Sequence, residues 1–278
     1  MRARSSLLAL AVVAACDRPQ PLVICHNGNC VGDAVPGDDD TLESLQASLD
    51  LRWDGRPTLD GVEVDTMWHR PTQACLFEHG PGEVLPADTV ADAGDLLVQH
   101  LALPDVAWNG DRFYVAIELK GYVAGRFDYH TPDELALHAD CVLDLYERLV
   151  AAAARRHRLQ VVFESSAVEL LEALIARPRW PGRLDGDVEV RLAGESGGIW
   201  DAAIQNPRLS EYTVQLDVME YLAGYSYDAQ VTAYRSLGVD LWIWSYATTP
   251  DELSAIEEHE PRAVLTSEAT MLRRWLTR

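Results

Sequence analysis

The chain has 278 residues, of which 44 are acidic and 23 are lysine or arginine, giving a formal net charge of −21. The phosphates of nucleic acids and of anionic lipids would repel such a protein, so its composition excludes nucleic-acid binding and electrostatic docking on membranes. The length is close to the roughly 250 residues of a (β/α)8 barrel and favours one large domain, which we expect to be a monomer.

The first sixteen residues have the features of an export signal. A basic start is followed by an apolar run over residues 7–13, which is too short for a membrane span of roughly 20 residues. Small residues then precede Cys16, and this pattern is similar to a bacterial lipobox, in which the cysteine is lipidated. We expect a signal peptide over 1–16 and an exported domain over 17–278, anchored at Cys16 to a bacterial membrane in the periplasm or at the cell surface. The alternative is an ordinary secretory signal followed by chance by a cysteine.

Short apolar segments in the first half of the chain each end in residues able to do acid, base or metal chemistry. These predicted strands cover residues 22–26, 62–65, 75–79 and 113–120. Side chains of a strand alternate in direction, so Glu63 and Asp65 point to one side, as do Glu118 and Lys120. Strands that finish in reactive groups are typical of a barrel whose site lies at the strand ends.

Helical and extended patterns alternate along the rest of the chain. Apolar spacing predicts helices over residues 41–49, 94–103, 133–156, 168–176, 227–237, 250–258 and 269–276. Further strands are predicted over residues 159–164, 188–192, 213–217, 239–245 and 263–266. This alternation predicts an α/β fold, a (β/α)8 TIM barrel that is either regular or irregular.

Four cysteines follow Cys16 in the sequence. Their spacing matches no metal-binding pattern, and an exported protein can keep disulfides. We interpret Cys25, Cys75 and Cys141, which lie within apolar segments, as buried free thiols. One bridge that involves Cys30 is the alternative, and the sequence does not identify its partner.

The carboxylates at the predicted strand ends suggest a cation site. Glu63, Asp65 and Glu118 would offer only oxygen ligands, which suits Ca²⁺ or Mg²⁺ rather than zinc. Such an ion polarises a phosphoryl oxygen and neutralises developing charge. The alternative is a structural role: the Glu-x-Asp pair occurs by chance, and acids at strand ends such as Glu78 and Glu164 only make salt bridges or cap helices.

Two histidines complete this set. Imidazole titrates near neutral pH, so one of His26 and His79 would activate a nucleophile and the other would protonate a leaving oxygen. Lys120 would hold a phosphate oxygen as a point charge. The combination favours cleavage of a phosphodiester, although a histidine in a strand is often only a hydrogen-bonded structural residue.

The order of these motifs resembles the glycerophosphodiester phosphodiesterase family. That family has a strand ending in His-Arg-Gly, then Pro-Glu-Asn-Thr-Leu, Glu-Leu-Asp, Phe-His-Asp and Glu-Ile-Lys. This chain has, in the same order, His26-Asn27-Gly28, Asp38-Asp39-Asp40-Thr41-Leu42, Glu63-Val64-Asp65, Phe77-Glu78-His79-Gly80 and Glu118-Leu119-Lys120. The similarity extends to Phe163-Glu164-Ser165-Ser166, Trp242-Ile243-Trp244-Ser245 and Thr266-Ser267-Glu268.

This resemblance implies a (β/α)8 barrel that hydrolyses a glycerol-linked phosphodiester to glycerol phosphate and an alcohol, as a phosphoric diester hydrolase that uses Ca²⁺ or Mg²⁺. It implies acid/base roles for His26 and His79, metal ligation by Glu63, Asp65 and Glu118, and substrate contacts from Lys120 and Trp244.

The chain departs from the family where phosphate and head group are recognised. Asn27 stands where the family has an arginine, and so a bidentate charged contact is replaced by a neutral one. Cleavage of lysophospholipid or sphingolipid head groups, in the manner of a phospholipase D, is therefore an alternative. Two further alternatives are a non-catalytic ligand-binding lipoprotein and a metal-independent glycoside hydrolase that uses Glu118 and Glu164.

Overall fold

The computed structural model describes eleven stretches of the chain, and every structural statement below refers to them. They cover residues 20–31, 39–80, 88–110, 112–125, 129–153, 158–182, 184–185, 188–194, 215–217, 240–245 and 247–278. The predicted signal peptide with Cys16 and the predicted helix over 227–237 lie outside the described residues. No helix among the described residues is long and apolar enough to cross a membrane.

The described strands form one ten-stranded sheet and a separate hairpin. Two of the ten, β5 (Ala74–Phe77) and β8 (Leu184–Asp185), are antiparallel to their neighbours, which leaves eight parallel strands. In sheet order these are β10 (Gln215–Asp217), β11 (Trp242–Trp244), β12 (Ala263–Thr266), β1 (Leu22–Cys25), β4 (Gly61–His69), β6 (Arg112–Ala124), β7 (Arg158–Ser165) and β9 (Val188–Gly194). The hairpin consists of β2 (Arg52–Trp53) and β3 (Arg56–Pro57).

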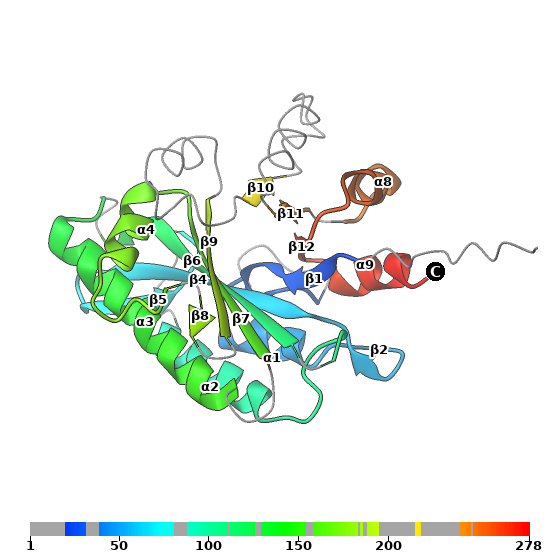
Figure 1. Cartoon of the computed structure of the whole chain (residues 1–278), viewed down its shortest axis with the longest axis horizontal. Helices are drawn as coiled ribbons and strands as arrows, with labels where there is room; N and C mark the ends of the chain where they lie inside the picture. The colour runs from blue at the N-terminus through cyan, green and yellow to red at the C-terminus, as the bar shows by residue number, and fades with distance from the viewer. Residues whose placement is uncertain are drawn as a thin grey trace, which may run out of the picture.

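The parallel strands curl around a common interior (Figure 1). The first strand, β1, pairs with the last, β12, with Leu22 opposite Ala263. The other parallel neighbours follow the order of the chain. In the part of the chain that the structure describes, β10 lies at one end of the sheet, and β9, flanked by the antiparallel β8, lies at the other. Pairing of the first strand with the last is the topology of a barrel, and the predicted (β/α)8 fold is confirmed in an irregular form.

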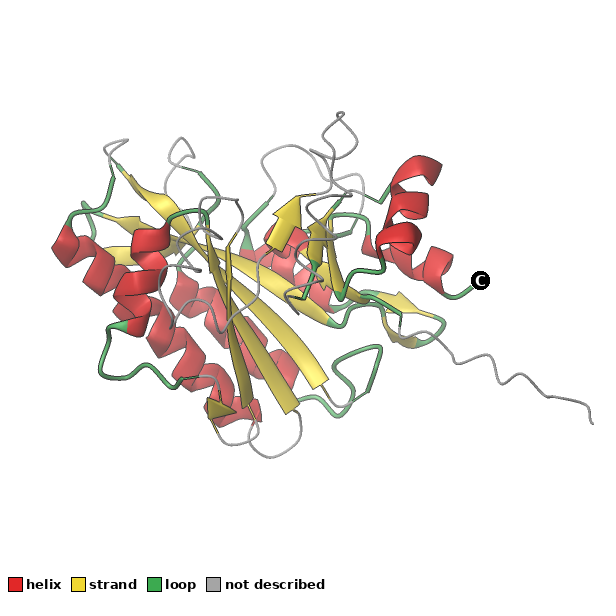
Figure 2. Ribbon diagram, turned by 45° about the horizontal axis from the view of Figure 1, so that its top comes forward, coloured by secondary structure: helices red, strands yellow, loops and turns green. Residues whose placement is uncertain are grey.

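Helices follow most of the parallel strands and cover the outside of the sheet (Figure 2). They are α1 (Leu42–Leu49), α2 (Val90–Leu101), α3 (Pro132–Ala153), α4 (Val168–Ile175), α8 (Pro250–His259) and α9 (Ala269–Leu276). Helix α2 begins earlier than the predicted 94–103 because Thr89 caps it, with its hydroxyl accepting from the backbone N–H of Asp92. The other predicted elements within the described residues are present, with ends shifted by a few residues.

Apolar side chains fill both faces of the curled sheet. Most of the core lies between the sheet and the outer helices, where Leu97, Leu143 and Leu170 are fully buried. A smaller cluster fills the interior of the curl and includes Ile24, Tyr114, Val162, Ala193, Trp242 and Leu265. Because side chains alternate along a strand, the residues two positions beyond this interior layer also point inward, at the carboxyl ends of the strands.

The segment predicted as a third barrel strand, residues 75–79, is different in the structure. Strand β5 turns back along β4 as an antiparallel partner, with Phe77 opposite Thr66 and Ala74 opposite His69. The prediction of a barrel strand here was wrong, because a short apolar run has the same pattern in a barrel strand and in a hairpin arm. The hairpin runs back from the carboxyl end of β4 until Phe77 is opposite Thr66, and Glu78 and His79 follow there, so that His79 reaches Asp65.

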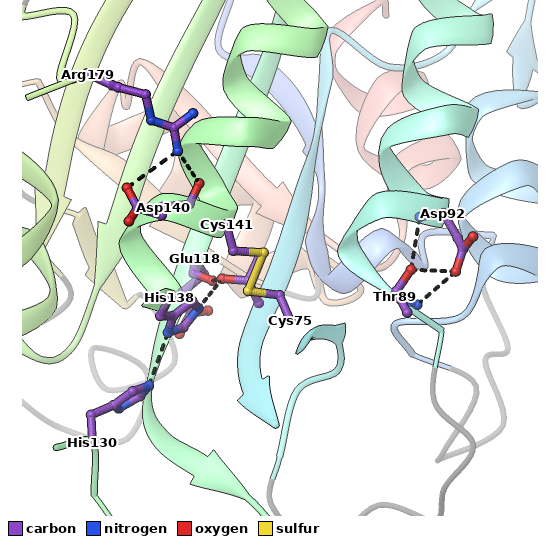
Figure 3. The surroundings of a disulfide bond; sticks show 10 residues. Cys75, Thr89, Asp92, Glu118, His130, His138, Asp140, Cys141 and Arg179 are labelled. Carbon is purple, nitrogen blue, oxygen red and sulfur yellow. Dashed lines mark hydrogen bonds and ion pairs between the residues drawn. A yellow bond between two sulfur atoms is a disulfide. The ribbon is translucent and has the colours of Figure 1, made fainter. Parts of the chain in front are cut away.

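The cysteine prediction was also partly wrong. Cys75 on β5 is disulfide-bonded to Cys141 on α3, with a Cα–Cα distance of 6.5 Å (Figure 3). Cys25 and Cys30 are buried free thiols. The bonded cysteines are 66 residues apart, so their contact depends on the packing of α3 against the hairpin. The disulfide therefore fastens the segment that leads to His79 to the outer helix layer.

Candidate active site

The site begins with a tight turn at the end of β1. His26, Asn27 and Gly28 form a short 3₁₀ turn in which Asn27 has φ 49° and Gly28 has φ 62°. Both angles lie in the left-handed region, which favours Asn and Gly. A Cβ atom at Gly28 would also approach the ring of Phe77 to 2.8 Å. The local backbone thus explains why residues that tolerate a positive φ, Asn27 and Gly28, follow His26.

Three neighbouring strands bring carboxylates to one place. Asp65 on β4 is opposite Glu118 on β6, and Glu118 is opposite Glu164 on β7. Glu63, two residues before Asp65, shares its side of β4. Glu63, Glu118 and Glu164 are all buried, and each offers an oxygen within 4.8 Å of the others. The sequence had shown Glu164 at a strand end without placing it in this group.

Lys120 lies within this acidic group and provides positive charge. Its Nζ is 2.5 Å from Glu118 Oε2 and 3.1 Å from Asp65 Oδ2, and its side chain is buried. Burial alone would raise the pKa of Asp65, but the Lys120 ammonium and the His79 hydrogen bond outweigh it and hold this pKa well below its ordinary value. Burial would likewise lower the pKa of Lys120, but Asp65 and Glu118 raise it well above the ordinary value. Lys120 is therefore an ammonium held between two carboxylates.

His79 is attached to the carboxylates by its ring. Its Nδ1 lies 2.7 Å from Asp65 Oδ2, and this hydrogen bond raises the pKa of His79 above its usual 6.5. Nearly half of the side chain, 47%, is exposed. Because Nδ1 faces Asp65, Nε2 is the nitrogen left for other partners. The Tyr122 hydroxyl donates to the backbone carbonyl of His79 over 2.5 Å, which fixes the main chain at this point.

His26 occupies a more buried position. Its Nε2 is 3.7 Å from Glu63 Oε2, and its ring centre is 4.9 Å from that of Trp244 on β11. Burial lowers the pKa of His26 to about 3, so the ring is neutral in the metal-free protein. Burial and the neighbouring Asp65 charge raise the pKa of Glu63 to about 7. The environments of the two histidines thus move their pKa values in opposite directions.

Asn27 joins the two histidines and the carboxylates. Its backbone N–H donates to Glu63 Oε2 over 2.9 Å. With the amide oxygen accepting from His79 Nδ1 at 3.1 Å, the amide nitrogen faces Glu63, Asp65 and His26 at 3.2–3.3 Å. The residue is 4% exposed. Asn27 is therefore embedded among the acidic groups.

Asp40 is a member of the site that the sequence did not single out. The residue is 4% exposed, and neither carboxylate oxygen has a hydrogen-bond partner among the described residues. Asp40, Asp65 and His79 each offer a ligand atom within 4.8 Å of the others. The signal in the sequence was the Asp38-Asp39-Asp40 run before α1, which is also a common composition for a solvated loop.

The donor set fits a divalent cation. The buried carboxylates supply oxygen ligands of the kind that Ca²⁺ and Mg²⁺ prefer. Oδ1 of Asp65 and both oxygens of Asp40 are buried without a hydrogen-bond partner among the described residues, and a buried carboxylate oxygen is costly to leave unpaired. A cation would satisfy these atoms and offset the negative charge that Lys120 does not balance.

The structure thus brings together the residues predicted for the site. Seven of them, namely His26, Asn27, Glu63, Asp65, His79, Glu118 and Lys120, are linked by the contacts above, and Trp244 packs against His26. The roles assigned to them remain predictions. The carboxyl end of the strands is where (β/α)8 barrels carry their active sites.

Comparison with known proteins gives matches in structure and not in sequence. No protein-family model matches the chain, and no curated protein sequence matches it. Among solved structures, glycerophosphodiester phosphodiesterase from Thermotoga maritima is 14% identical and aligns over 92% of this chain and 98% of its own, with a TM-score of 0.54. The corresponding enzyme from Agrobacterium tumefaciens str. C58 is 11% identical and aligns over 92% and 100%, also with a TM-score of 0.54.

A third similar structure is a calcium-dependent phosphoinositol-specific phospholipase C from a Pseudomonas species. It is 11% identical, aligns over 90% of this chain and 89% of its own, and has a TM-score of 0.54. The chain shares the fold of these enzymes. The resemblance seen in the order of the sequence motifs is therefore confirmed at the level of the fold, over nearly the whole length of each structure.

Proposed function

We propose that this protein is a cation-dependent phosphoric diester hydrolase that cleaves glycerophosphodiesters to glycerol phosphate and an alcohol. The observation that carries the proposal is the linked set of two histidines, three carboxylates and a lysine at the carboxyl end of the barrel strands. The shared fold with two glycerophosphodiester phosphodiesterases and a phospholipase C supports phosphodiester cleavage as the reaction class.

Glu63, Asp65 and Glu118 would hold the cation, which is Ca²⁺ or Mg²⁺. When bound, it would withdraw electron density from a phosphoryl oxygen and stabilise negative charge in the transition state. All three residues are at most 5% exposed, so little bulk water competes with their interactions. The calcium dependence named for the Pseudomonas phospholipase is consistent with this ion type.

The two histidines would divide the proton transfers of hydrolysis. Oxygen of a water molecule attacks phosphorus, the bond from phosphorus to the alcohol oxygen breaks, one imidazole takes a proton from the water, and the other protonates the departing oxygen. Asp65 holds Nδ1 of His79, so Nε2 of that ring would face the substrate. His26 packs against Trp244, which would also line the substrate pocket.

Recognition of the substrate would differ from that of enzymes with an arginine after the first histidine. Asn27 is surrounded by His26, Glu63, Asp65 and His79, and Lys120 is engaged with two carboxylates. Phosphate binding would therefore depend more on the cation. Lysophospholipid or sphingolipid head groups are the alternative substrates, and the phospholipase neighbour adds phosphoinositides to the set to be tested.

The proposal is tested by cleavage of glycerophosphocholine, lysophosphatidylcholine and phosphatidylinositol by the purified protein. Each is incubated with Ca²⁺, Mg²⁺ or EDTA, and products are followed by phosphorus NMR. We expect cation-dependent turnover that falls roughly 10²- to 10⁴-fold in His26→Ala. His100→Gln is the matched control, because His100 bonds the carbonyl of Val106 and contacts Phe113, near the amino end of β6.

A folded protein that turns over none of these substrates with either cation would contradict the proposal. It would favour the alternative of a non-catalytic ligand-binding lipoprotein. Turnover that persists in EDTA would instead reject the cation dependence and leave a metal-independent hydrolase.

We also propose that Cys16 anchors the exported protein to a membrane, which would place the barrel near lipid-derived diesters. This rests on the basic and apolar start of the chain and the small residues before Cys16. Cys16→Ser should release the protein from the membrane fraction of an expressing bacterium. Retention of the variant in that fraction would contradict the anchor.

A further inference from the structure

We propose that Asp40 is a further oxygen ligand of the cation. The inference rests on the proposed function, because it concerns the ion placed there at Glu63, Asp65 and Glu118. It assigns a direct role to a residue from the turn before α1, on a different segment of the chain from the strands that carry those three carboxylates.

The backbone directs Asp40 into the site. Its N–H donates to the carbonyl of Asn27 over 3.0 Å, which ties the turn to the residue that links the two histidines. The residue has φ 56°, in the left-handed region. The next residue, Thr41, is the N-cap of α1, so the position of Asp40 is fixed from both sides. The result is a carboxylate beside Asp65 and His79, with ligand atoms within 4.8 Å of one another.

Other aspartates in this protein show how a structural carboxylate is satisfied. Asp60 is fully buried, and its oxygens accept from the N–H of Val23, from Asn109 and from Arg273. Asp39, next to Asp40, accepts from the amide of Asn29 over 3.0 Å. Asp40 is 96% buried by comparison and has no such donor on either oxygen among the described residues.

A cation explains this difference. Leaving two carboxylate oxygens buried and unpaired is costly, and a nearby acid, Asp65, adds repulsion. Ca²⁺ takes six to eight oxygen ligands and Mg²⁺ takes six, so three carboxylates that each bind through one oxygen leave at least three positions for further ligands. A bound ion close to Asp65 would give the oxygens of Asp40 the positive partner that they lack.

The test is cation binding by Asp40→Asn, with Asp39→Asn as the matched control. Asparagine tolerates the left-handed backbone, so the turn is preserved. Isothermal titration calorimetry of the EDTA-treated proteins with Ca²⁺ and with Mg²⁺ should give an affinity roughly 10- to 100-fold weaker in Asp40→Asn. Asp39→Asn should bind within about twofold of the original protein.

Thermal unfolding without and with cation separates ligation from a structural role. Without cation, Asp40→Asn should unfold at the same temperature as the original protein or at a higher one. Adding the cation should raise the unfolding temperature of Asp40→Asn by less than that of the original protein. The inference would be overturned if Asp40→Asn bound both cations as tightly as the original protein. It would also be overturned if the variant were less stable than the original protein only in the absence of cation. If the original protein itself bound neither cation, the cation dependence in the proposed function would fail, and the role of Asp40 with it.

Discussion

His79 Nδ1 lies 2.7 Å from Oδ2 of Asp65, a carboxylate with no exposed surface. The two residues are fourteen positions apart and meet because β5 runs back along β4. One hairpin therefore supplies both the proton-carrying ring and the carboxylate that orients it. Such a pair favours the imidazolium form, since the hydrogen bond and the negative charge both stabilise it.

Asp65→Asn should lower the pKa of His79 in the metal-free protein. The hydrogen bond to Asp65 is the main reason that this pKa lies above 6.5, and Lys120, which lowers it, would remain. Proton NMR of the His79 ring across pH 5 to 9 in EDTA measures the change. Asp39→Asn, whose carboxylate contacts Asn29 instead, should leave the titration as it is. An unchanged His79 pKa in Asp65→Asn would show that the pair is not coupled in solution.

The Cys75–Cys141 disulfide should stabilise the fold and hold the hairpin that precedes His79. Closing a loop of 66 residues contributes roughly 4 kcal/mol in the chain-entropy model. We expect Cys141→Ser to lower the midpoint of urea unfolding and to reduce kcat, because Cys75 lies four residues before His79. Dithiothreitol should have the same effect on the original protein and no further effect on the variant. Equal stability with and without reductant would contradict this.

Helix α3, which carries Cys141 of the disulfide, also contacts the strands of the site through a second side chain. His138 lies on α3, three residues before Cys141 (Figure 3). Its Nε2 is 2.9 Å from the Thr66 hydroxyl, which donates to the backbone carbonyl of Glu118. Loosening α3 would thus disturb both the hairpin and β6. This contact is a second physical reason to expect a loss of activity on reduction.

The sequence was sufficient to predict the barrel and which residues lie together at the candidate site, whereas their roles remain predictions. Period-two alternation placed Glu63 with Asp65 and Glu118 with Lys120, and the structure brings these pairs together on β4 and β6. That inference worked because strand direction and side-chain alternation are local properties. They hold in any parallel sheet whose neighbouring strands end at the same edge.

Relationships that depend on packing were not predictable. The hairpin direction of β5 and the Cys75–Cys141 bond depend on how α3 lies against the sheet. The position of Asp40 depends on its backbone hydrogen bond to Asn27, which lies thirteen residues earlier, at the end of a different element. A run of three aspartates has the composition of a solvated turn, and only the tertiary contacts distinguish the buried one.

Arg273→Met should destabilise the protein without changing the chemistry of the site. The Arg273 side chain is fully buried, and it donates to Asp60 over 2.7 Å and to the carbonyl of Thr58 over 2.9 Å. Removing it leaves the Asp60 charge uncompensated, which costs about 3–5 kcal/mol. Urea unfolding measures the loss, and kcat of the folded fraction should be unchanged, since Asp60 precedes β4 at its amino end.

The neighbouring Arg274→Met is the matched control for this prediction. Arg274 is exposed on the same helix, α9, and lies over the ring of Trp53, so its loss should cost less than 1 kcal/mol, roughly the value of an exposed cation–π contact. The double variant Asp60→Asn/Arg273→Met should recover part of the lost stability, because it removes the uncompensated charge. Equal destabilisation by the two single arginine variants would show that the buried pair has no special role.

Protonation of Glu134 should lower the free energy of unfolding as the pH falls. Arg70 donates to both carboxylate oxygens of Glu134, over 2.5 and 2.9 Å, and its hydrogen bond is the main cause that lowers the pKa of Glu134 from 4.5 to about 2. A carboxylate whose pKa is lower in the folded state stabilises the protein above the unfolded pKa, and this contribution is lost as the pH falls. The loss should begin near pH 4.5 and be complete near pH 2.

Glu134→Gln tests this linkage. At pH 7 the variant should be less stable by roughly 1.5–3 kcal/mol, the range for hydrogen bonds to charged groups. Its free energy of unfolding should then fall less steeply than that of the original protein between pH 5 and 2, so that the two curves converge. Glu258→Gln, an exposed change on α8, should give a curve parallel to the original. A constant difference between Glu134→Gln and the original protein across this range would show that Glu134 does not carry the acid sensitivity.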